Sequence, residues 1–532
     1  MRWHHQAVGT GKAGPGRFAR ARRRLHTLWF CTLGLVGVLP APHALGFGFD
    51  DVTELARSRS ERPYVAPDEI PRFLQNLSYD QFRSIRFKPD QSLWRPSSTR
   101  FQVMLTAPGR HLNHRVDIHE VNREGVAPIP FDKAQFDFGN EDFAKRIPAD
   151  LGLAGLRLTY PINDPGIQDQ FLVFEGASYF RGVGAGEVFG LSARGLAVDT
   201  ALPKGEEFPR FTRFWLERPT PWAQVMRLYA LLESPSVAGA YQFTLYPGED
   251  TRVEVEVRLF ARAPIARLGL APLTSMFYYG EGMTRPRGQW RPEVHDSDGL
   301  LIRTGDDRWT WRPLSNPLRL QQYSFQLDQV RGFGLLQRDQ RFAAYEDGEA
   351  RYERRPSAWV ELHSGSGPGR VMLILISTPD ETNDNVVAFW TPAETIEAGE
   401  MLAFDYSLTF GDSSIPEQPV AHTVNSFVGL GETAPADAGI YRFVVDYAGG
   451  ALREMDEAAP VVGKVTLSAG AVLLDSYVEY IEASDVWRLS FLVDGPEANG
   501  MEINAGLHLD GDAISETWSY HLPAQNSLQA PP

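Results

Sequence analysis

The feature that most constrains the fold is the strict alternation in residues 252–259, which read Arg-Val-Glu-Val-Glu-Val-Arg-Leu. Successive side chains of a strand point to opposite sides of a sheet, so this segment predicts a strand with one face on a core. Similar strand patterns occur at residues 101–105, 243–246 and 403–410. Gly and Pro are frequent, 48 and 38 in 532 residues, and they separate these runs as turns do. An all-β fold with a large antiparallel β domain is therefore predicted.

The C-terminal part carries a second, smaller set of strand patterns. A chain of 532 residues is long enough for two domains. Residues 411–419 have the Gly, Ser and Pro content of a linker, which places the large domain at 47–410. Residues 420–525 suit one small immunoglobulin-like β-sandwich. Its clearest alternating runs are 441–447, 461–467 and 487–493.

The N-terminus, residues 1–44, has the composition of an export signal. It contains seven basic residues and no acid, and its apolar run at 28–39 is too short to span a bilayer. Arg22, Arg23 and Arg24 before that run resemble a twin-arginine signal, which exports folded proteins, so we expect a periplasmic protein that is not embedded in a membrane after cleavage. A retained membrane anchor is the alternative.

The charge and the cysteine content exclude several classes of site. Removal of the seven basic residues changes the formal net charge from −15 to −22, which argues against nucleic acid as a partner. The only cysteine, Cys31, lies in the signal, so the mature protein has no disulfide and no cysteine metal site. The spacing of His111, His114 and His119 could bind a metal, but the intervening residues read as strand and turn. No metal and no cofactor is predicted.

An acid-rich connection at 380–385, Asp-Glu-Thr-Asn-Asp-Asn, lies between strand patterns at 370–376 and 386–390. Crowding raises the cost of ionising its three carboxyls together, so one can stay protonated near neutral pH. A protonated carboxyl is the proton donor that glycosidic cleavage needs. The alternative is a polar, solvated turn.

Two further segments carry groups that suit sugar recognition. Trp309 and Trp311 would share one face of a strand and could form an apolar plate for sugar rings, although core packing is the alternative. They follow a second acid-rich stretch at 290–299. Residues 347–359 supply Arg and Tyr donors that can orient hydroxyls and hold a carboxylate charged, or can form a surface ion-pair cluster.

These segments together resemble the periplasmic glucans biosynthesis protein family, G and D types. The resemblance extends from about residue 47 to the C-terminus and is carried by residues 276–280, 290–299, 309–313, 331–338, 351–360 and 380–390. It implies a large galactose-mutarotase-like β-sandwich followed by an immunoglobulin-like domain, in agreement with the strand patterns. The arginine-rich signal favours the D type.

The resemblance also implies an activity. The family acts on the β-1,2-linked glucose backbone of osmoregulated periplasmic glucans, and its members resemble glycoside hydrolases of the endo-β-1,2-glucanase type. Asp384 matches the general acid and Asp296 the proposed base, and four positions match residues that line the cleft: Tyr352, Arg355, Glu381 and Thr382.

Other functions stay open at this point. One is a transglycosylase or cyclising enzyme on β-1,2-glucan. Another is a non-catalytic glucan-binding protein that guides the product of a membrane glucan synthase. A mutarotase-type epimerase rests on fold analogy alone.

Overall fold

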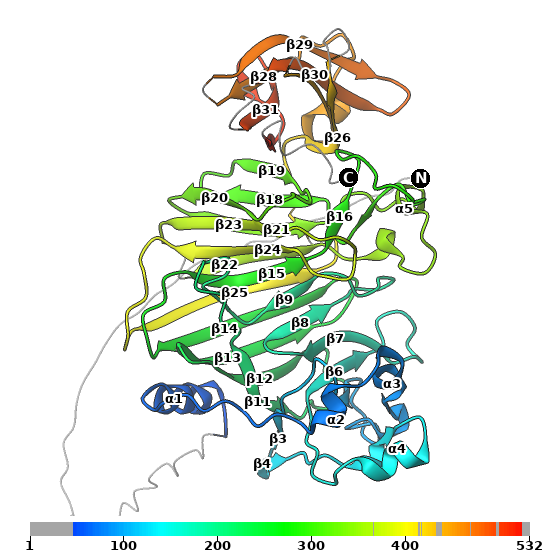
Figure 1. Ribbon diagram of the computed structural model, residues 1–532, viewed down its shortest axis with the longest axis vertical. Coiled ribbons are helices and arrows are strands. Elements are labelled where there is room, and N and C mark those ends of the chain that lie inside the picture. Colours follow the sequence, from blue (N-terminus) through cyan, green and yellow to red (C-terminus); the bar gives the residue numbers. More distant parts are fainter. Residues whose placement is uncertain are drawn as a thin grey trace, which may run out of the picture. The chain divides into compact units, whose positions relative to one another are not determined.

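Two large β-sheets enclose the main hydrophobic core (Figure 1). The computed structural model describes residues 46–364, 367–412, 415–416, 418–431, 439–468, 470–495 and 500–523. The predicted signal in residues 1–44 lies outside these described residues. From Gly46 onward the described chain belongs to one compact unit. The prediction of an all-β chain, with a large antiparallel sandwich followed by a small one, is confirmed.

The first sheet has ten strands, and its pairs are antiparallel. Its order is β2 (Gln102–Thr106), β6 (Gly155–Tyr160), β7 (Asp169–Glu175), β8 (Tyr179–Gly182), β9 (Ser192–Arg194), β15 (Leu268–Ser275), β24 (Val386–Pro392), β23 (Gly369–Leu375) and β20 (Gln321–Leu327), with β10 (Ala197–Val198) paired to β15. The acid-rich connection predicted from the sequence joins β23 to β24. It therefore lies at the end of two neighbouring, buried strands.

The second sheet has fifteen strands. Its order is β28 (Val462–Leu467), β31 (Met501–Leu509), β33 (Thr517–Leu522), β19 (Trp309–Pro313), β18 (Gly299–Thr304), β21 (Val330–Leu336), β22 (Ala358–Ser364), β25 (Met401–Phe410), β14 (Thr251–Ala261), β13 (Val237–Tyr246), β12 (Met226–Glu233), β11 (Arg210–Glu217), β3 (Asp117–Asn122) and β4 (Gly125–Pro128), with β32 (Asp512–Ala513) paired to β31. In β14, Val253, Val255 and Val257 are buried in the main core, whereas Glu254 and Glu256 are half-buried on the other face. The predicted alternation is thus observed.

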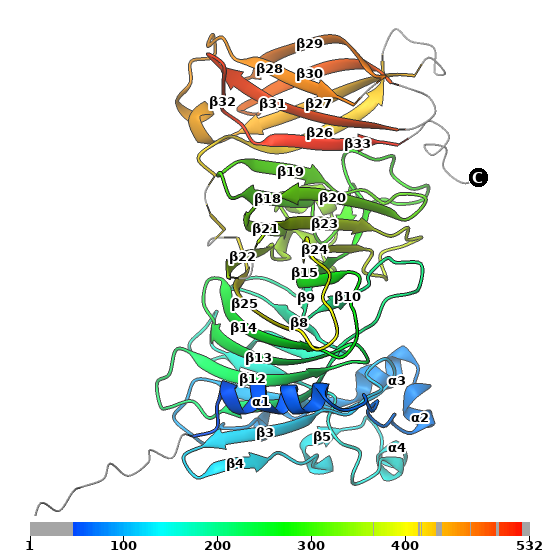
Figure 2. The same cartoon turned by 90° about the vertical axis from the view of Figure 1, so that its left-hand side faces the viewer.

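Short helices and small sheets complete the large sandwich. Helix α1 (Phe49–Ser60) covers the outer face of β12–β14, where Val52 and Ala56 pack against Trp215 and Tyr229 (Figure 2). The other elements of this part are α2 (Arg72–Gln75), α3 (Tyr79–Ser84), α4 (Glu141–Arg146), α5 (Phe342–Tyr345), η1 (Pro89–Gln91), η2 (Lys133–Gln135), η3 (Tyr352–Arg354), the pair β1 (Arg86–Phe87) and β5 (Phe136–Asp137), and the pair β16 (Phe277–Tyr279) and β17 (Val294–His295). The short helix η4 (Gly450–Glu454) belongs to the C-terminal sandwich. No helix of the described residues is both long and apolar enough to cross a membrane.

The C-terminal strands build a second sandwich. A four-stranded sheet in the order β26 (His422–Leu430), β27 (Ile440–Ala448), β30 (Val486–Asp494) and β29 (Val472–Ile481) packs with β28, β31 and β33 around a separate core. Phe443, Phe491 and Trp518 form the aromatic centre of that core. Parallel pairing of β33 with β19, at Trp518 and Trp311, makes one sheet continuous between the two sandwiches.

Candidate functional site

The connection between β23 and β24 is held firmly at its base. Asn385 is 1% exposed, and its Nδ2 donates to the carbonyl oxygens of Phe277 and Ile376, both at 3.0 Å. Its Oδ1 accepts from the backbone N–H of Phe277 at 2.8 Å. Earlier in the connection, the backbone N–H of Thr378 donates to Oδ1 of Asn316 at 3.0 Å. A buried amide satisfied on both sides gives the connection a defined position beside β16.

Two of the three acids of this connection have their own partners. Oδ1 of Asp380 accepts from the backbone N–H of Thr382 at 2.9 Å and from its hydroxyl at 2.5 Å, and these bonds lower the pKa of Asp380. The two carboxylate oxygens of Glu381 lie 3.0 and 2.5 Å from the guanidinium of Arg291, which also binds Asp347 at 3.0 Å. Such a bidentate pair stabilises the charged form of the carboxylate. We expected the acids of this connection to crowd one another and so to keep one of them protonated. Asp380 and Glu381 instead face hydrogen-bond donors.

Asp384 is the third acid, and its side chain is 34% exposed. Its Oδ2 lies 3.6 Å from the guanidinium of Arg181 on β8. Tyr179 precedes on the same face of β8, and Arg194 of β9 lies over its ring at 4.7 Å. Burial raises the pKa of Tyr179, the charge of Arg194 opposes this shift, and the charge of Asp384 adds to it. Sequence reasoning missed this strand, although Tyr179 and Arg181 alternate with the buried Phe180.

Asp296 follows β17 and lies deep in the protein, 4% exposed. Its carboxylate forms an ion pair with Arg355. Burial raises the pKa of Asp296, the charge of Arg355 opposes this shift, and the charge of Asp384 adds to it. The structure therefore brings the two predicted catalytic acids, from separate parts of the chain, into one electrostatic environment.

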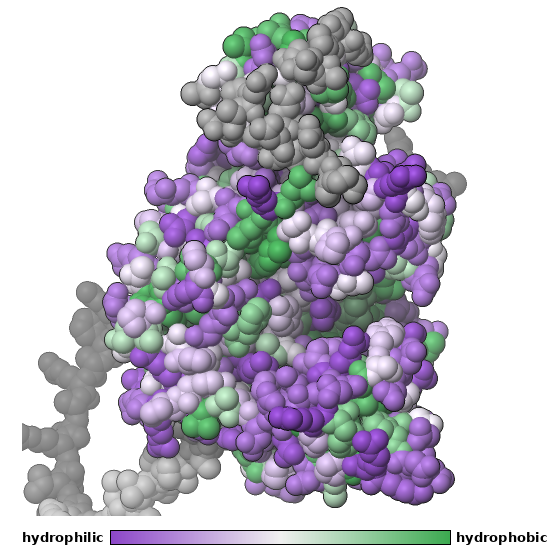
Figure 3. All heavy atoms as spheres, viewed as in Figure 1, coloured by the Kyte–Doolittle hydropathy of each residue, from purple (hydrophilic) through white to green (hydrophobic). Residues whose placement is uncertain are grey.

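Tyr352 and Arg355 lie beside these acids. The guanidinium of Arg355 stacks over the ring of Tyr352 at 4.3 Å, and Tyr352 itself is 2% exposed in η3. Burial raises the pKa of Tyr352, and the charges of Glu381 and Asp296 contribute to the shift. Thr382 is exposed on the connection. Of the four residues predicted to line the cleft, Arg355 contacts Asp296, Tyr352 packs against Arg355, and Glu381 and Thr382 lie on the same connection as Asp384. Figure 3 shows a hollow on the right-hand side of the view, bordered largely by hydrophilic residues.

The prediction that Trp309 and Trp311 form an exposed plate for sugar is wrong. They do share one face of β19, but each is 3% exposed and belongs to the core of the C-terminal sandwich. The ring of Trp309 stacks on Trp359 at 5.9 Å, and Arg338 lies 3.6 Å over Trp311. Pairing of β19 with β33 brings the C-terminal sandwich over this face. The exposed indole near the site is instead Trp290, at 64%, next to Arg291.

Glu187 is a further buried carboxyl, and its titration should make the stability of the fold depend on pH. Burial raises the pKa of Glu187 to about 8, and the charges of Asp412 and Asp250 contribute. The folded protein holds this proton more tightly than the unfolded chain does. The fold therefore loses stability as the pH rises from about 4.5 to 8. We expect Glu187→Gln to raise the melting temperature by several degrees at pH 9 and to leave it nearly unchanged at pH 4.5. Melting curves recorded between pH 4.5 and pH 9 check this prediction, and Glu124→Gln, at an exposed carboxyl, is the control. A pH-independent effect would contradict it.

Comparison with known proteins identifies the family. Residues 47–522 match the family described as "Periplasmic glucan biosynthesis protein, MdoG". The chain belongs to this periplasmic glucan biosynthesis family. It is 43% identical over 500 residues to Glucans biosynthesis protein G of Ralstonia nicotianae, covering 92% of this chain and 99% of that protein. Identity to the proteins of the same name is 38% over 514 residues in Dickeya dadantii and 40% over 513 residues in Pseudomonas paraeruginosa. The alignments cover 95% and 94% of this chain, and 98% of each relative. These relatives are G-type proteins, so they lend no support to the D type that the N-terminal arginines favoured.

Proposed function

We propose that the protein cleaves the β-1,2-linked glucose backbone of periplasmic glucans as a glycoside hydrolase of the endo-β-1,2-glucanase type. The observation that carries the proposal is the pairing of a partly exposed carboxyl, Asp384, with a buried, arginine-bound carboxylate, Asp296, in one electrostatic environment. Glycoside hydrolysis uses two carboxyl groups in different protonation states. Family membership and the names of the relatives point to glucan as the substrate class.

The two acids differ in access, which suggests their roles. Asp384 is open enough to approach a glycosidic oxygen and donate a proton as general acid. Burial raises the pKa of Asp296, and the charge of Arg355 opposes this shift, in the direction that a general base requires. Because Asp296 is only 4% exposed, it would activate the attacking water through an intervening hydroxyl or water.

Polar groups around the acids would hold the sugar. In this proposal Thr382 and Glu381 contact sugar hydroxyls from the exposed connection, and Arg291 holds Glu381 in place through two hydrogen bonds. Tyr352 and Arg355 bound the deeper end of the site. Residues 47–410 would carry the chemistry, residues 420–525 would support them, and a membrane glucan synthase would supply the backbone.

Incubation of the purified mature protein with linear β-1,2-glucan tests the proposal. Shorter chains with new reducing ends are the expected products. Rings or redistributed chain lengths without a net gain of reducing ends would identify transglycosylation instead. Saturable binding with unchanged chain lengths would overturn the enzymatic proposal and favour the glucan-binding assembly protein.

Export through the twin-arginine route is part of the same proposal. Replacing Arg22, Arg23 and Arg24 together by Lys keeps the charge but removes the guanidinium groups that the exporter would recognise. We expect the precursor to accumulate in the cytoplasm, measured by immunoblotting of cell fractions. Normal accumulation of the Lys variant in the periplasm would contradict this route.

A further inference from the structure

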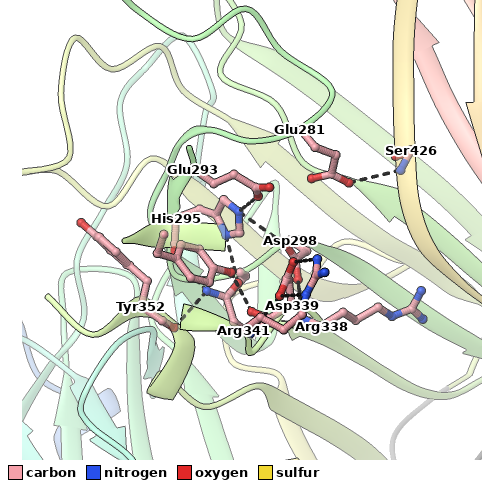
Figure 4. A network of polar contacts seen from close by, with 12 residues as sticks. Glu281, Glu293, His295, Asp298, Arg338, Asp339, Arg341, Tyr352 and Ser426 are labelled. Atoms are coloured by element: carbon pink, nitrogen blue, oxygen red, sulfur yellow. Dashed lines mark hydrogen bonds and ion pairs between the residues drawn. The ribbon is translucent and has the colours of Figure 1, made fainter. Parts of the chain in front are cut away.

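A buried histidine meets several carboxylates beside the junction of the two sandwiches (Figure 4). His295, at the end of β17, is 0% exposed. Its Nε2 lies 2.8 Å from Oε2 of Glu293 and 3.5 Å from Oδ1 of Asp298. Glu281 lines the same pocket as Asp298 and accepts from the backbone N–H of Ser426, on β26, at 3.2 Å.

The second nitrogen of His295 has a defined partner that directs Nε2 toward the carboxylates. Nδ1 lies 2.9 Å from Oε1 of Gln337. The Nε2 amide of Gln337 donates to the carbonyl oxygens of His295 and Tyr352, at 3.0 and 3.2 Å, so its oxygen must face the ring. Nδ1 therefore carries a hydrogen and donates it. This arrangement is the one that orients histidine ligands in metal sites.

The carboxylate of Asp298 is also oriented from behind. Its Oδ2 accepts from the backbone N–H groups of Arg338 and Asp339, the latter at 3.0 Å, which leaves Oδ1 on the side of His295. One ligand atom each from Glu293, His295 and Asp298 lies within 4.8 Å of the others. Ligands bound at about 2.0–2.2 Å to one metal lie roughly 3 Å apart, so only small side-chain shifts would close this site on an ion.

The neighbouring Arg338 does not balance the charges of the cluster. The guanidinium of Arg338 points away and binds both oxygens of Glu516, at 2.7 and 2.9 Å. Three carboxylates therefore share one imidazole. A divalent cation would supply the missing positive charge.

A pocket gives access to the cluster from the junction. Glu281, Asp298 and Thr423 all line it. Thr423 is 2% exposed, and its buried hydroxyl has no hydrogen-bond partner. An unsatisfied buried hydroxyl is an independent sign that this pocket accommodates a polar ligand, such as the water shell of an ion.

We propose that Glu293, His295 and Asp298, with Glu281 as a further carboxylate, bind a Zn²⁺ ion beside the junction of the two sandwiches. An imidazole nitrogen combined with carboxylate oxygens suits Zn²⁺ better than Mg²⁺ or Ca²⁺, which prefer oxygen ligands alone. The proposal departs from the expectation that the chain holds no metal. The test measures metal content and melting temperature, so it does not depend on the substrate.

Metal binding by the full mature protein tests the site. After removal of metal with a chelator, the protein is dialysed against Zn²⁺, Mg²⁺ or Ca²⁺, and its metal content and melting temperature are measured. We expect about one Zn²⁺ per chain and a higher melting temperature with Zn²⁺ alone. His295→Gln should weaken Zn²⁺ binding at least tenfold, and the matched control His521→Gln, in the pair His521–Glu502, should not.

A second variant keeps the test decisive if His295→Gln fails to fold. Glu293→Gln removes a ligand oxygen from a less buried side chain, and it should also weaken Zn²⁺ binding at least tenfold. Failure of the wild type to retain Zn²⁺, or equal Zn²⁺ affinity in Glu293→Gln and the wild type, would overturn the proposal. The cluster would then be a protonated histidine held by carboxylates.

Discussion

Replacing Asp384 by Asn is expected to lower the rate of glucan cleavage by about 10²–10⁴-fold, the usual contribution of a general acid. The amide keeps the size of the side chain but has no proton to give to the leaving oxygen. Asp384 is partly exposed and lies on a connection whose base is fixed by Asn385, so the fold should not change. Release of reducing ends from linear β-1,2-glucan, measured at saturating substrate, checks this.

Asp380→Asn is the matched control for Asp384→Asn. Asp380 is in the same connection, and its carboxylate accepts hydrogen bonds from Thr382. This variant should keep activity within a few-fold of the wild type. Unchanged cleavage by Asp384→Asn would remove Asp384 from the mechanism. Equal losses in both variants would assign the effect to the shape of the connection.

Replacing Arg338 by Met is expected to cost about 3–5 kcal/mol of unfolding free energy, since it leaves a buried carboxylate without its cation. The side chain of Glu516 is 0% exposed, and Arg338 contacts both of its oxygens. The guanidinium also covers the ring of Trp311, so packing is lost with the charge. Urea unfolding followed by Trp fluorescence measures the change.

An exposed ion pair gives the control for Arg338→Met. Arg308 contacts Asp306 at 2.8 Å, but their side chains are 78% and 61% exposed. Pairs of this kind contribute roughly 0–1 kcal/mol, so Arg308→Met should unfold almost as the wild type does. Adding Glu516→Gln to Arg338→Met should recover part of the loss by removing the uncompensated charge. Wild-type stability of Arg338→Met would show that the junction does not depend on this pair.

Local sequence determined the elements and the position of the acidic connection. The alternation at 252–259 specifies which side chains of β14 enter the core, because a strand has a period of two. The apolar runs at 370–376 and 386–390 fill two buried strands, so the polar residues between them had to form the connection. The family motif then indicated Asp384 and Asp296, which the fold brings into one electrostatic environment.

Only the tertiary structure decided what covers each face of a strand and which charged side chains pair with each other. Alternation places Trp309 and Trp311 on one side of β19 but cannot say whether water or another sandwich lies there. That depends on the pairing of β33 with β19, between residues far apart in the chain. The partners Arg181 for Asp384, Arg291 for Glu381 and Gln337 for His295 likewise come from other strands and connections. A local pattern specifies the direction of a side chain, whereas its burial and its electrostatic partners depend on long-range strand pairing.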